Sequence, residues 1–115
     1  PEHPAHAVSG ELRAHLAQQT DAVGRRFEIV DLPAPATLRD EDGFVDWSYV
    51  NHLVTNDGVV ACGFGDARAD AAAREILADV YPGRRVVTVD ARPLFDRGGG
   101  IHCITQQQPS VGVLS

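Results

Sequence analysis

The chain has 115 residues, enough for one hydrophobic core and too few for two independent ones. Its formal net charge of −6 argues against a nucleic-acid partner, because phosphate binding needs clustered cations, whereas it would favour a cationic substrate. No apolar run approaches the roughly 20 residues that span a bilayer, and the N-terminus lacks a basic and then hydrophobic signal pattern. We therefore expect a cytoplasmic protein with no membrane partner.

The first predicted element is a helix over residues 4–23. Proline suits its first turn, apolar residues recur at near helical spacing, and Gly24 provides the stop. We expect this helix to cover a sheet. Residues 27–32 form a short apolar run with β-branched and aromatic side chains, which predicts a buried strand.

Residues 33–43 contain two prolines and an acidic cluster, which predict a solvated loop. Two strands are predicted next, at residues 49–56 and 59–64. They are joined at Asp57-Gly58, the dipeptide that favours a type I′ hairpin turn. Alternation along the first strand places Asn51 and His52 on opposite faces, so either side chain could look into a site.

A helix is predicted after the hairpin. Asp66 is its N-cap, apolar residues between 69 and 80 form a continuous stripe, and Pro82-Gly83 ends it. Residues 85–90 are the next predicted strand, and residues 91–96 a short turn or single helical turn. The order from the hairpin onward is strand, strand, helix, strand, a ββαβ unit in an α/β chain.

Three consecutive glycines, residues 98–100, lead into a predicted strand at residues 101–105 that carries Cys103. Glycine leaves the backbone free to take positive φ and to pass close to a ligand. A thiol is partly ionised at neutral pH and strongly nucleophilic. Although a free cysteine is more often a buried small hydrophobe, Cys103 is a candidate for covalent catalysis.

The second cysteine, Cys62, lies in an apolar strand and is interpreted as core. The two cysteines form no C-x-x-C pair, and without a signal sequence we expect both to be free. A zinc site built from both cysteines with His52 and His102 matches no common ligand spacing. If residues 101–105 are extended, His102 faces away from the Cys103 pocket, so we assign it no catalytic role.

Several stretches resemble one enzyme family. They are GGGIHCITQQ at residues 98–107, DWSYVN at 46–51, DGVV at 57–60, FGD at 64–66, PGR at 82–84 and VDAR at 89–92. Together they resemble the bacterial and plant agmatine deiminases, which are grouped with the bacterial-type peptidylarginine deiminases. The resemblance covers most of the chain from about residue 46. Members of this family are several times longer, so the chain resembles their C-terminal part, and the N-terminal remainder is an expected partner.

The resemblance implies the pentein fold, in which five ββαβ blades form a propeller around a central site. The chain would then be an α/β C-terminal portion of a pentein. Residues 1–32 would close one blade, residues 44–90 would form a complete blade, and residues 97–115 would hold the nucleophile strand and the C-terminal tail. Such a piece exposes sheet edges and apolar faces, so we also expect self-association into a homo-oligomer.

The resemblance also implies a function: hydrolysis of agmatine, a small cationic guanidinium substrate, to N-carbamoylputrescine and ammonia, in putrescine and polyamine biosynthesis. Cys103 would be the nucleophile and would pass through a covalent amidino-cysteine intermediate. Gly99, Gly100 and Asn51 would contact the substrate. No metal or organic cofactor is implied.

Alternatives remain open at this point. Peptidylarginine or free arginine could be the substrate, because contacts to its far end are not in this chain. The family's acid/base histidine and guanidinium-binding carboxylates come from earlier motifs of the Gly-His-x-Asp kind, and none occurs here. We therefore expect the chain alone to be inactive. A truncated, non-catalytic fragment that self-associates is the alternative from a different class.

Overall fold

The protein is described by a computed structural model, in which the described residues are 3–111. Two predicted segments, residues 1–32 and 97–115, extend past this range. Their parts at residues 1–2 and 112–115 lie outside the described residues. The chain forms two compact units. The first holds the N-terminal residues up to 31 together with 38–45, and the second holds 32–37 together with the chain from residue 46.

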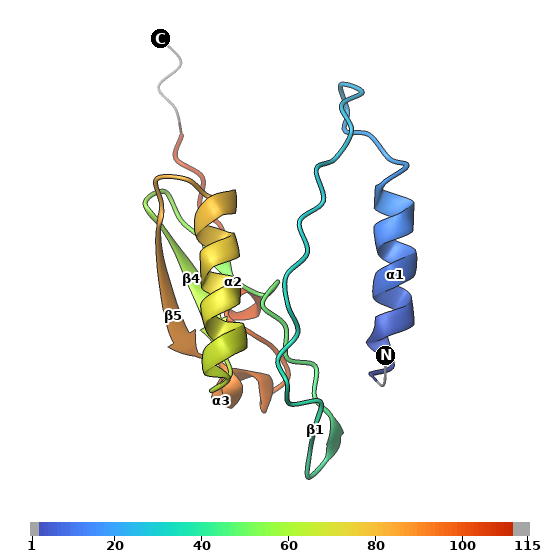
Figure 1. Ribbon diagram of the computed structural model, residues 1–115. Helices are drawn as coiled ribbons and strands as arrows, with labels where there is room; N and C mark the ends of the chain where they lie inside the picture. The colour runs from blue at the N-terminus through green and yellow to red at the C-terminus, as the bar shows by residue number, and fades with distance from the viewer. Residues whose placement is uncertain (1–2, 112–115) are drawn as a thin grey trace. The chain divides into compact units, whose positions relative to one another are not determined.

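The first unit begins with helix α1 (Ala5–Leu16), which Figure 1 draws in blue. The helix ends well before residue 23, where the sequence predicted its end. The carboxylate of Asp21 accepts the backbone N–H groups of Val23 and Arg25 at 3.0 and 2.9 Å, and these bonds close a turn instead of a further helical turn. No residue of α1 is buried, and the expectation that this helix covers a sheet stays a prediction.

The predicted strand at residues 27–32 is also wrong. These residues join no strand, because among the described residues no neighbouring strand takes up their backbone groups. A two-stranded antiparallel sheet lies instead inside the predicted loop, between β1 (Arg39–Asp40) and β2 (Gly43–Phe44). Asp40 accepts the N–H groups of the turn that joins these strands, which is a local turn signal that the sequence analysis missed.

The second unit contains the predicted ββαβ order. Strands β3 (Leu53–Val54), β4 (Gly58–Gly63) and β5 (Arg85–Asp90) form one sheet in the order β3-β4-β5. The β3 and β4 strands are antiparallel, whereas β4 and β5 are parallel. Helix α2 (Ala67–Val80) connects the parallel pair and packs on it (Figure 1).

The β3–β4 hairpin is confirmed, but its turn differs from the prediction. Thr55 N–H donates to the Gly58 carbonyl at 2.8 Å, which places Asn56 and Asp57 at the two central positions. A type I′ turn needs positive φ at both positions, and no described residue other than glycine has positive φ. Residues 49–52 form a turn and irregular backbone ahead of β3 instead of the start of a long strand.

The ends of α2 follow the prediction. Asp66 caps the helix by accepting the Ala69 N–H at 3.0 Å, and Gly83, with φ of +81°, turns the chain into β5. Two residues of the predicted apolar stripe, Ala73 and Leu77, are buried. The predicted helical turn after β5 is α3 (Arg92–Phe95).

An aromatic cluster forms the core beside β4. The ring of Phe64 stacks on Trp47 and makes edge contacts with Tyr49 and Phe95, at centroid distances between 5.1 and 5.3 Å. The hydroxyl of Tyr49 donates to Asp70 at 2.6 Å, and burial together with this acceptor raises the pKa of Tyr49 far above its ordinary value. The segment at residues 46–51 is thereby fixed to the sheet and to α2.

The predicted strand at residues 101–105 is wrong. Residues His102–Ile104 form a 3₁₀ helix, η1. Gly98, with φ of +98°, reverses the chain ahead of it, and Thr105 closes it by donating both its N–H and its hydroxyl to the His102 carbonyl. The turn chemistry of glycine and threonine therefore prevails over the strand preference of the apolar residues.

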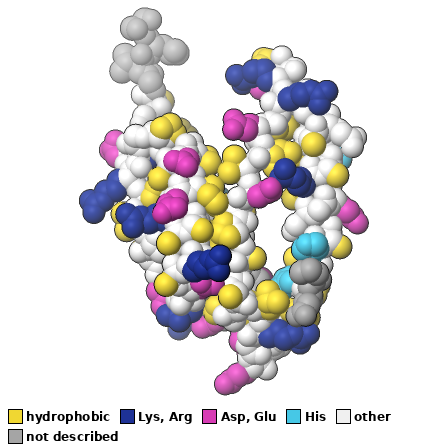
Figure 2. All heavy atoms as spheres, viewed as in Figure 1, with side chains coloured by type: hydrophobic (Ala, Val, Ile, Leu, Met, Phe, Trp, Pro, Cys, Tyr) yellow, Lys and Arg dark blue, Asp and Glu magenta, His cyan; other side chains and the backbone are white. Residues whose placement is uncertain are grey.

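Charged and apolar side chains are interspersed on the α2 face of the second unit (Figure 2). Within residues 3–111, no helix has the length and apolar character needed to cross a membrane.

Candidate active site

A pocket of about 410 Å³ opens in the second unit. It lies where the segment ahead of β3 meets α3, the glycine run and η1. Its lining consists of Asp46, Ser48, Val50, Asn51, Phe95, Gly98, Gly99, His102 and Cys103. Residues from two distant parts of the sequence, 46–51 and 95–103, thus build one site.

The nucleophile candidate, Cys103, is exposed on the wall of this pocket. Its Sγ lies 3.1 Å from Nδ2 of Asn51, which donates to it. This side-chain hydrogen bond, with a further bond from the Gly100 backbone, lowers the pKa of the Cys103 thiol, while desolvation and, to a smaller extent, the charge of Asp46 oppose the effect. An accessible thiol with a lowered pKa is the kind that reacts as a nucleophile.

Asn51 links three parts of the site. Besides its bond to Cys103, its Oδ1 accepts the backbone N–H of His102 at 2.8 Å. Its main-chain carbonyl accepts the S–H of Cys62 at 3.0 Å. The predicted alternation on a strand did not anticipate this arrangement, because residues 49–52 form no strand.

The two glycines that the sequence predicted at the site have different surroundings. Gly99 lines the pocket, and a Cβ there would lie 3.0 Å from the Cβ of Cys103. Gly100 is buried, and a Cβ there would lie 2.5 Å from Cγ of Asn51 and 2.8 Å from the ring of Phe95. Space for neighbouring side chains requires glycine at Gly100, whereas the reversal of the chain requires it at Gly98.

His102 lies on the same pocket as Cys103, so the prediction that it faces away is wrong. That prediction assumed an extended backbone, and consecutive side chains of a 3₁₀ helix do not point to opposite sides. His52, the other histidine considered, does not line the pocket. Its ring contacts the Tyr49 carbonyl at 2.9 Å and the Tyr81 hydroxyl at 3.1 Å.

Cys62 is core, as predicted, with 1% of its surface exposed. Burial raises the pKa of its thiol, and the neighbouring Cys103 adds to the effect. Both cysteines are free. Among residues 3–111, the side chains of His, Cys, Asp and Glu form no group of three or more that could hold a metal ion.

Other pocket residues were missed as site candidates. Asp46 and Ser48 appeared in the sequence only as part of the DWSYVN resemblance, and Phe95 only as part of a predicted turn. The sequence gives one signal that they share: each lies within a few residues of Asn51 or of the glycine run at residues 98–100. Their convergence depends on the packing of α3 against the aromatic core.

The family model for Porphyromonas-type peptidyl-arginine deiminase matches residues 1–109. The chain belongs to this family. A Streptomyces avermitilis relative named "Putative agmatine deiminase" is 52% identical over 95% of the chain, and the agmatine deiminase of Pseudomonas putida is 39% identical over 83%. These alignments span 31% and 30% of the two relatives, so the chain covers about a third of their length.

The family resemblance extends to the fold. An agmatine deiminase structure from Enterococcus faecalis matches 92% of the chain with a TM-score of 0.82 and 30% sequence identity, and the match covers 33% of that structure. The family member described here therefore has the α/β fold of the pentein-family deiminases, as the sequence predicted.

Proposed function

We propose that this chain supplies the cysteine nucleophile of a deiminase, a hydrolase that releases ammonia from a guanidinium group. The proposal is carried by one observation: the exposed sulfur of Cys103 lies in a pocket and receives a hydrogen bond that favours its thiolate. Membership of the deiminase family gives this thiolate its reaction class.

The reaction follows from the chemistry of a thiolate and a guanidinium. The Sγ of Cys103 forms a bond to the guanidinium carbon, and the resulting adduct loses one nitrogen, which takes up a proton and leaves as ammonia. Water then attacks the amidino-cysteine carbon and gives up two protons, of which one replaces the proton taken up by ammonia and the other is released to solvent. The C–S bond breaks, and the thiolate returns while a ureido product departs. Splitting one hard hydrolysis into two steps is the benefit of covalent catalysis.

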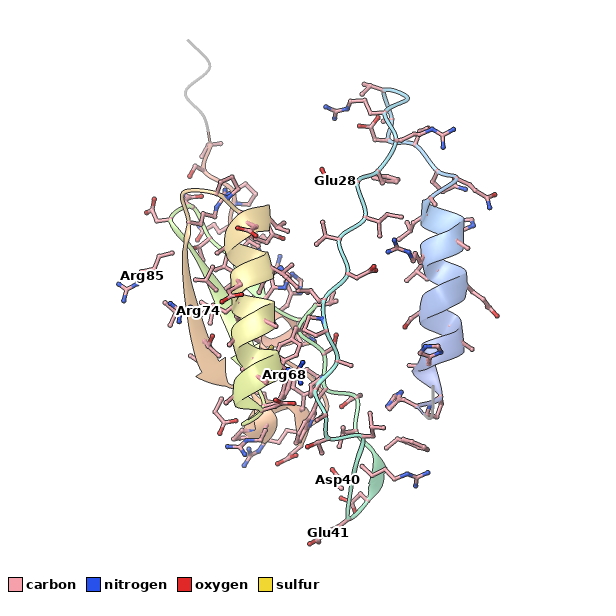
Figure 3. All side chains as sticks on the ribbon, in the orientation of Figure 1. Glu28, Asp40, Glu41, Arg68, Arg74 and Arg85 are labelled. Atoms are coloured by element: carbon pink, nitrogen blue, oxygen red, sulfur yellow. The ribbon has the colours of Figure 1, made fainter. Side chains whose placement is uncertain are left out.

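The charge of the pocket suits such a substrate. Asp46 lines it, whereas its lining includes no lysine or arginine. The arginines labelled in Figure 3, Arg68 and Arg74 on α2 and Arg85 on β5, are exposed and lie outside that lining. A cationic group can therefore approach Cys103 without a repelling neighbour from this lining.

Agmatine is the substrate we favour, because the Pseudomonas putida relative and the Enterococcus faecalis structure are both named agmatine deiminase. The products would be N-carbamoylputrescine and ammonia, a step toward putrescine. Peptidylarginine is the second candidate, from the family model's description. The acid/base and guanidinium-binding groups would come from sequence beyond this chain, so we expect these 115 residues alone to be inactive.

The test is Cys103→Ala in the full-length enzyme, assayed for ammonia release from agmatine, arginine and a peptidylarginine substrate. Loss of the nucleophile should lower kcat on the order of 10³-fold or more. Asn56→Ala, in the exposed hairpin turn, is the control and should keep full turnover. Turnover by Cys103→Ala close to that of the control would remove Cys103 from the mechanism.

A further inference from the structure

We infer that Asp46 binds the ammonium end of the substrate, and so makes the pocket selective for an alkylguanidine that carries a second cation. This inference rests on the proposed function and deepens it, because it concerns the substrate class of the same pocket. The sequence analysis placed the contacts to the far end of the substrate outside this chain, whereas Asp46 is one such contact within it.

Asp46 is a carboxylate left available in the pocket. It is the acidic residue of the pocket lining, and it is exposed. Within residues 3–111, the ion pairs of the protein use other carboxylates, so Asp46 has no ion-pair partner there. The neighbouring hydroxyl is already engaged, since Oγ of Ser48 accepts the Val50 N–H at 3.3 Å. The carboxylate is therefore the polar group of this segment that can pair with a cationic ligand.

Asp46 stands away from the reacting sulfur. The last residue of its segment, Asn51, contacts Sγ of Cys103 at 3.1 Å. The chain turns between Ser48 and Asn51, whose N–H donates to the Ser48 carbonyl at 3.3 Å, and Asp46 precedes that turn. Asp46 acts on Cys103 through its charge, and this is the smallest of the influences that set the pKa of the thiol. The carboxylate is thus in the pocket but not against the sulfur.

This separation decides which end of the substrate Asp46 can hold. During attack the guanidinium carbon must lie roughly 3–3.5 Å from the sulfur. A carboxylate that held the guanidinium would then lie close to the thiolate as well, and the two negative charges would interact strongly. Asp46 does not meet that condition. Its position suits a second cation, such as the ammonium that agmatine carries beyond its methylene chain.

The rest of the lining suits the methylene chain. The apolar side chains of Val50 and Phe95 line the same pocket as Asp46 and Cys103. Each methylene that leaves water against such side chains favours binding by up to about 0.8 kcal/mol. A nucleophile, an apolar wall and a carboxylate in one pocket match in kind the guanidinium, the alkyl chain and the ammonium of agmatine.

The same carboxylate discriminates against the other candidate substrates. Free arginine carries a carboxylate at its far end, which Asp46 repels. Peptidylarginine ends in neutral peptide groups, which leave Asp46 without an ionic partner. Specificity of this kind uses a repelled or unpaired group against the wrong ligand as well as an attraction for the right one. Asp46 therefore favours agmatine over both.

The test compares two substrates in the full-length enzyme: agmatine and N-butylguanidine, which has the same alkyl chain and no ammonium. We expect Asp46→Asn to lower the ratio of their kcat/KM values about tenfold, as loss of one charge-assisted contact implies. The loss should fall mainly on KM for agmatine, because the contact exists both before and during the reaction. Asp46→Glu keeps the charge and should keep most of the ratio.

Asp57→Asn makes the same change of charge in the exposed turn between β3 and β4, and is the matched control. Its ratio should equal that of wild type. A ratio in Asp46→Asn that equals the control's would overturn the inference. An equal loss for both substrates gives that result, and would assign Asp46 to the guanidinium end.

A second measurement needs no turnover. A ligand in the pocket should slow the initial rate at which iodoacetamide modifies Cys103, quantified on the peptide that contains it. In wild type, agmatine should protect Cys103 at about tenfold lower concentration than N-butylguanidine, and in Asp46→Asn the two concentrations should converge. Equal protection by both ligands in wild type would refute the inference even in an active deiminase. Absence of turnover with the protection preference intact would instead refute the deiminase proposal and support the Asp46 contact.

Discussion

The two cysteines lie in regions of contrasting structure. Cys62 belongs to β4, a six-residue strand paired on both sides, with 1% of its surface exposed. Cys103 belongs to η1, a single 3₁₀ turn after a glycine run, and it is exposed on a pocket. Burial raises the pKa of the first thiol, whereas the Asn51 side chain lowers the pKa of the second.

The contrast shows that hydrogen bonding and solvation decide what a thiol does in this unit. One residue touches both sulfurs: Asn51 accepts from Cys62 through its carbonyl and donates to Cys103 through its amide. The thiol of Cys62 holds the backbone of Asn51, and the side chain of Asn51 in turn donates to the sulfur of Cys103. Strand β4 buries Cys62, whereas the 3₁₀ turn η1 leaves Cys103 exposed to the pocket.

The largest expected effect is the difference in reactivity between the two thiols. In the folded protein at neutral pH, iodoacetamide should modify Cys103 on the order of 100-fold faster than Cys62, because one is accessible and favours its thiolate while the other must be uncovered first. The Cys103 rate should level off at lower pH than in urea-unfolded protein, since its pKa is lowered in the folded state.

Peptide mass spectrometry of a labelling time course gives both rates, and urea provides the control in which the two rates should converge. Comparable slow labelling of both cysteines in the folded protein would contradict the contrast. It would favour the alternative of an inert fragment.

The next largest effect concerns the stability of the fold around Gly100, the glycine that packs against Asn51. Gly100→Ala should destabilise the fold by about 1–3 kcal/mol, because the new Cβ overlaps Asn51 and Phe95 and forces a core side chain to move. Urea unfolding measures the change. Gly10→Ala is the control: it lies within α1 with open space around its Cβ position, and should stabilise by roughly 0.5–1 kcal/mol. A Gly100→Ala protein as stable as wild type would show that the packing around Asn51 is loose.

The smallest expected effect is the difference between the two cysteines in what each contributes to the free energy of unfolding. Cys62→Ala removes the donor to the Asn51 carbonyl in the core and should cost about 1 kcal/mol in the free energy of unfolding. Cys103→Ala, on an exposed turn, should change it by less than about 0.5 kcal/mol. The reverse order in the same urea titrations would mean that Cys103 is structural.

Local chemistry in the sequence was enough to predict β4, α2 and β5. An aspartate that caps a helix, a glycine that ends one, and β-branched runs between them act over a few residues, so their effect does not depend on the rest of the chain. The family resemblance singled out Cys103 and Asn51 as site residues. The hairpin was predictable for the same local reason, although its turn type was not.

Tertiary structure decided the rest. Asn51 and Cys103 are 52 residues apart, and no local pattern encodes the bond between them. The strand predicted at residues 27–32 failed because an extended run needs a partner, and the strand predicted at residues 101–105 failed because Asn51 and Thr105 hold a 3₁₀ turn there. Sequence by itself singled out Cys103, Asn51 and Gly99 as candidate site residues. Contacts between distant segments decided which of them face one pocket, because side chains meet only after the backbone has packed.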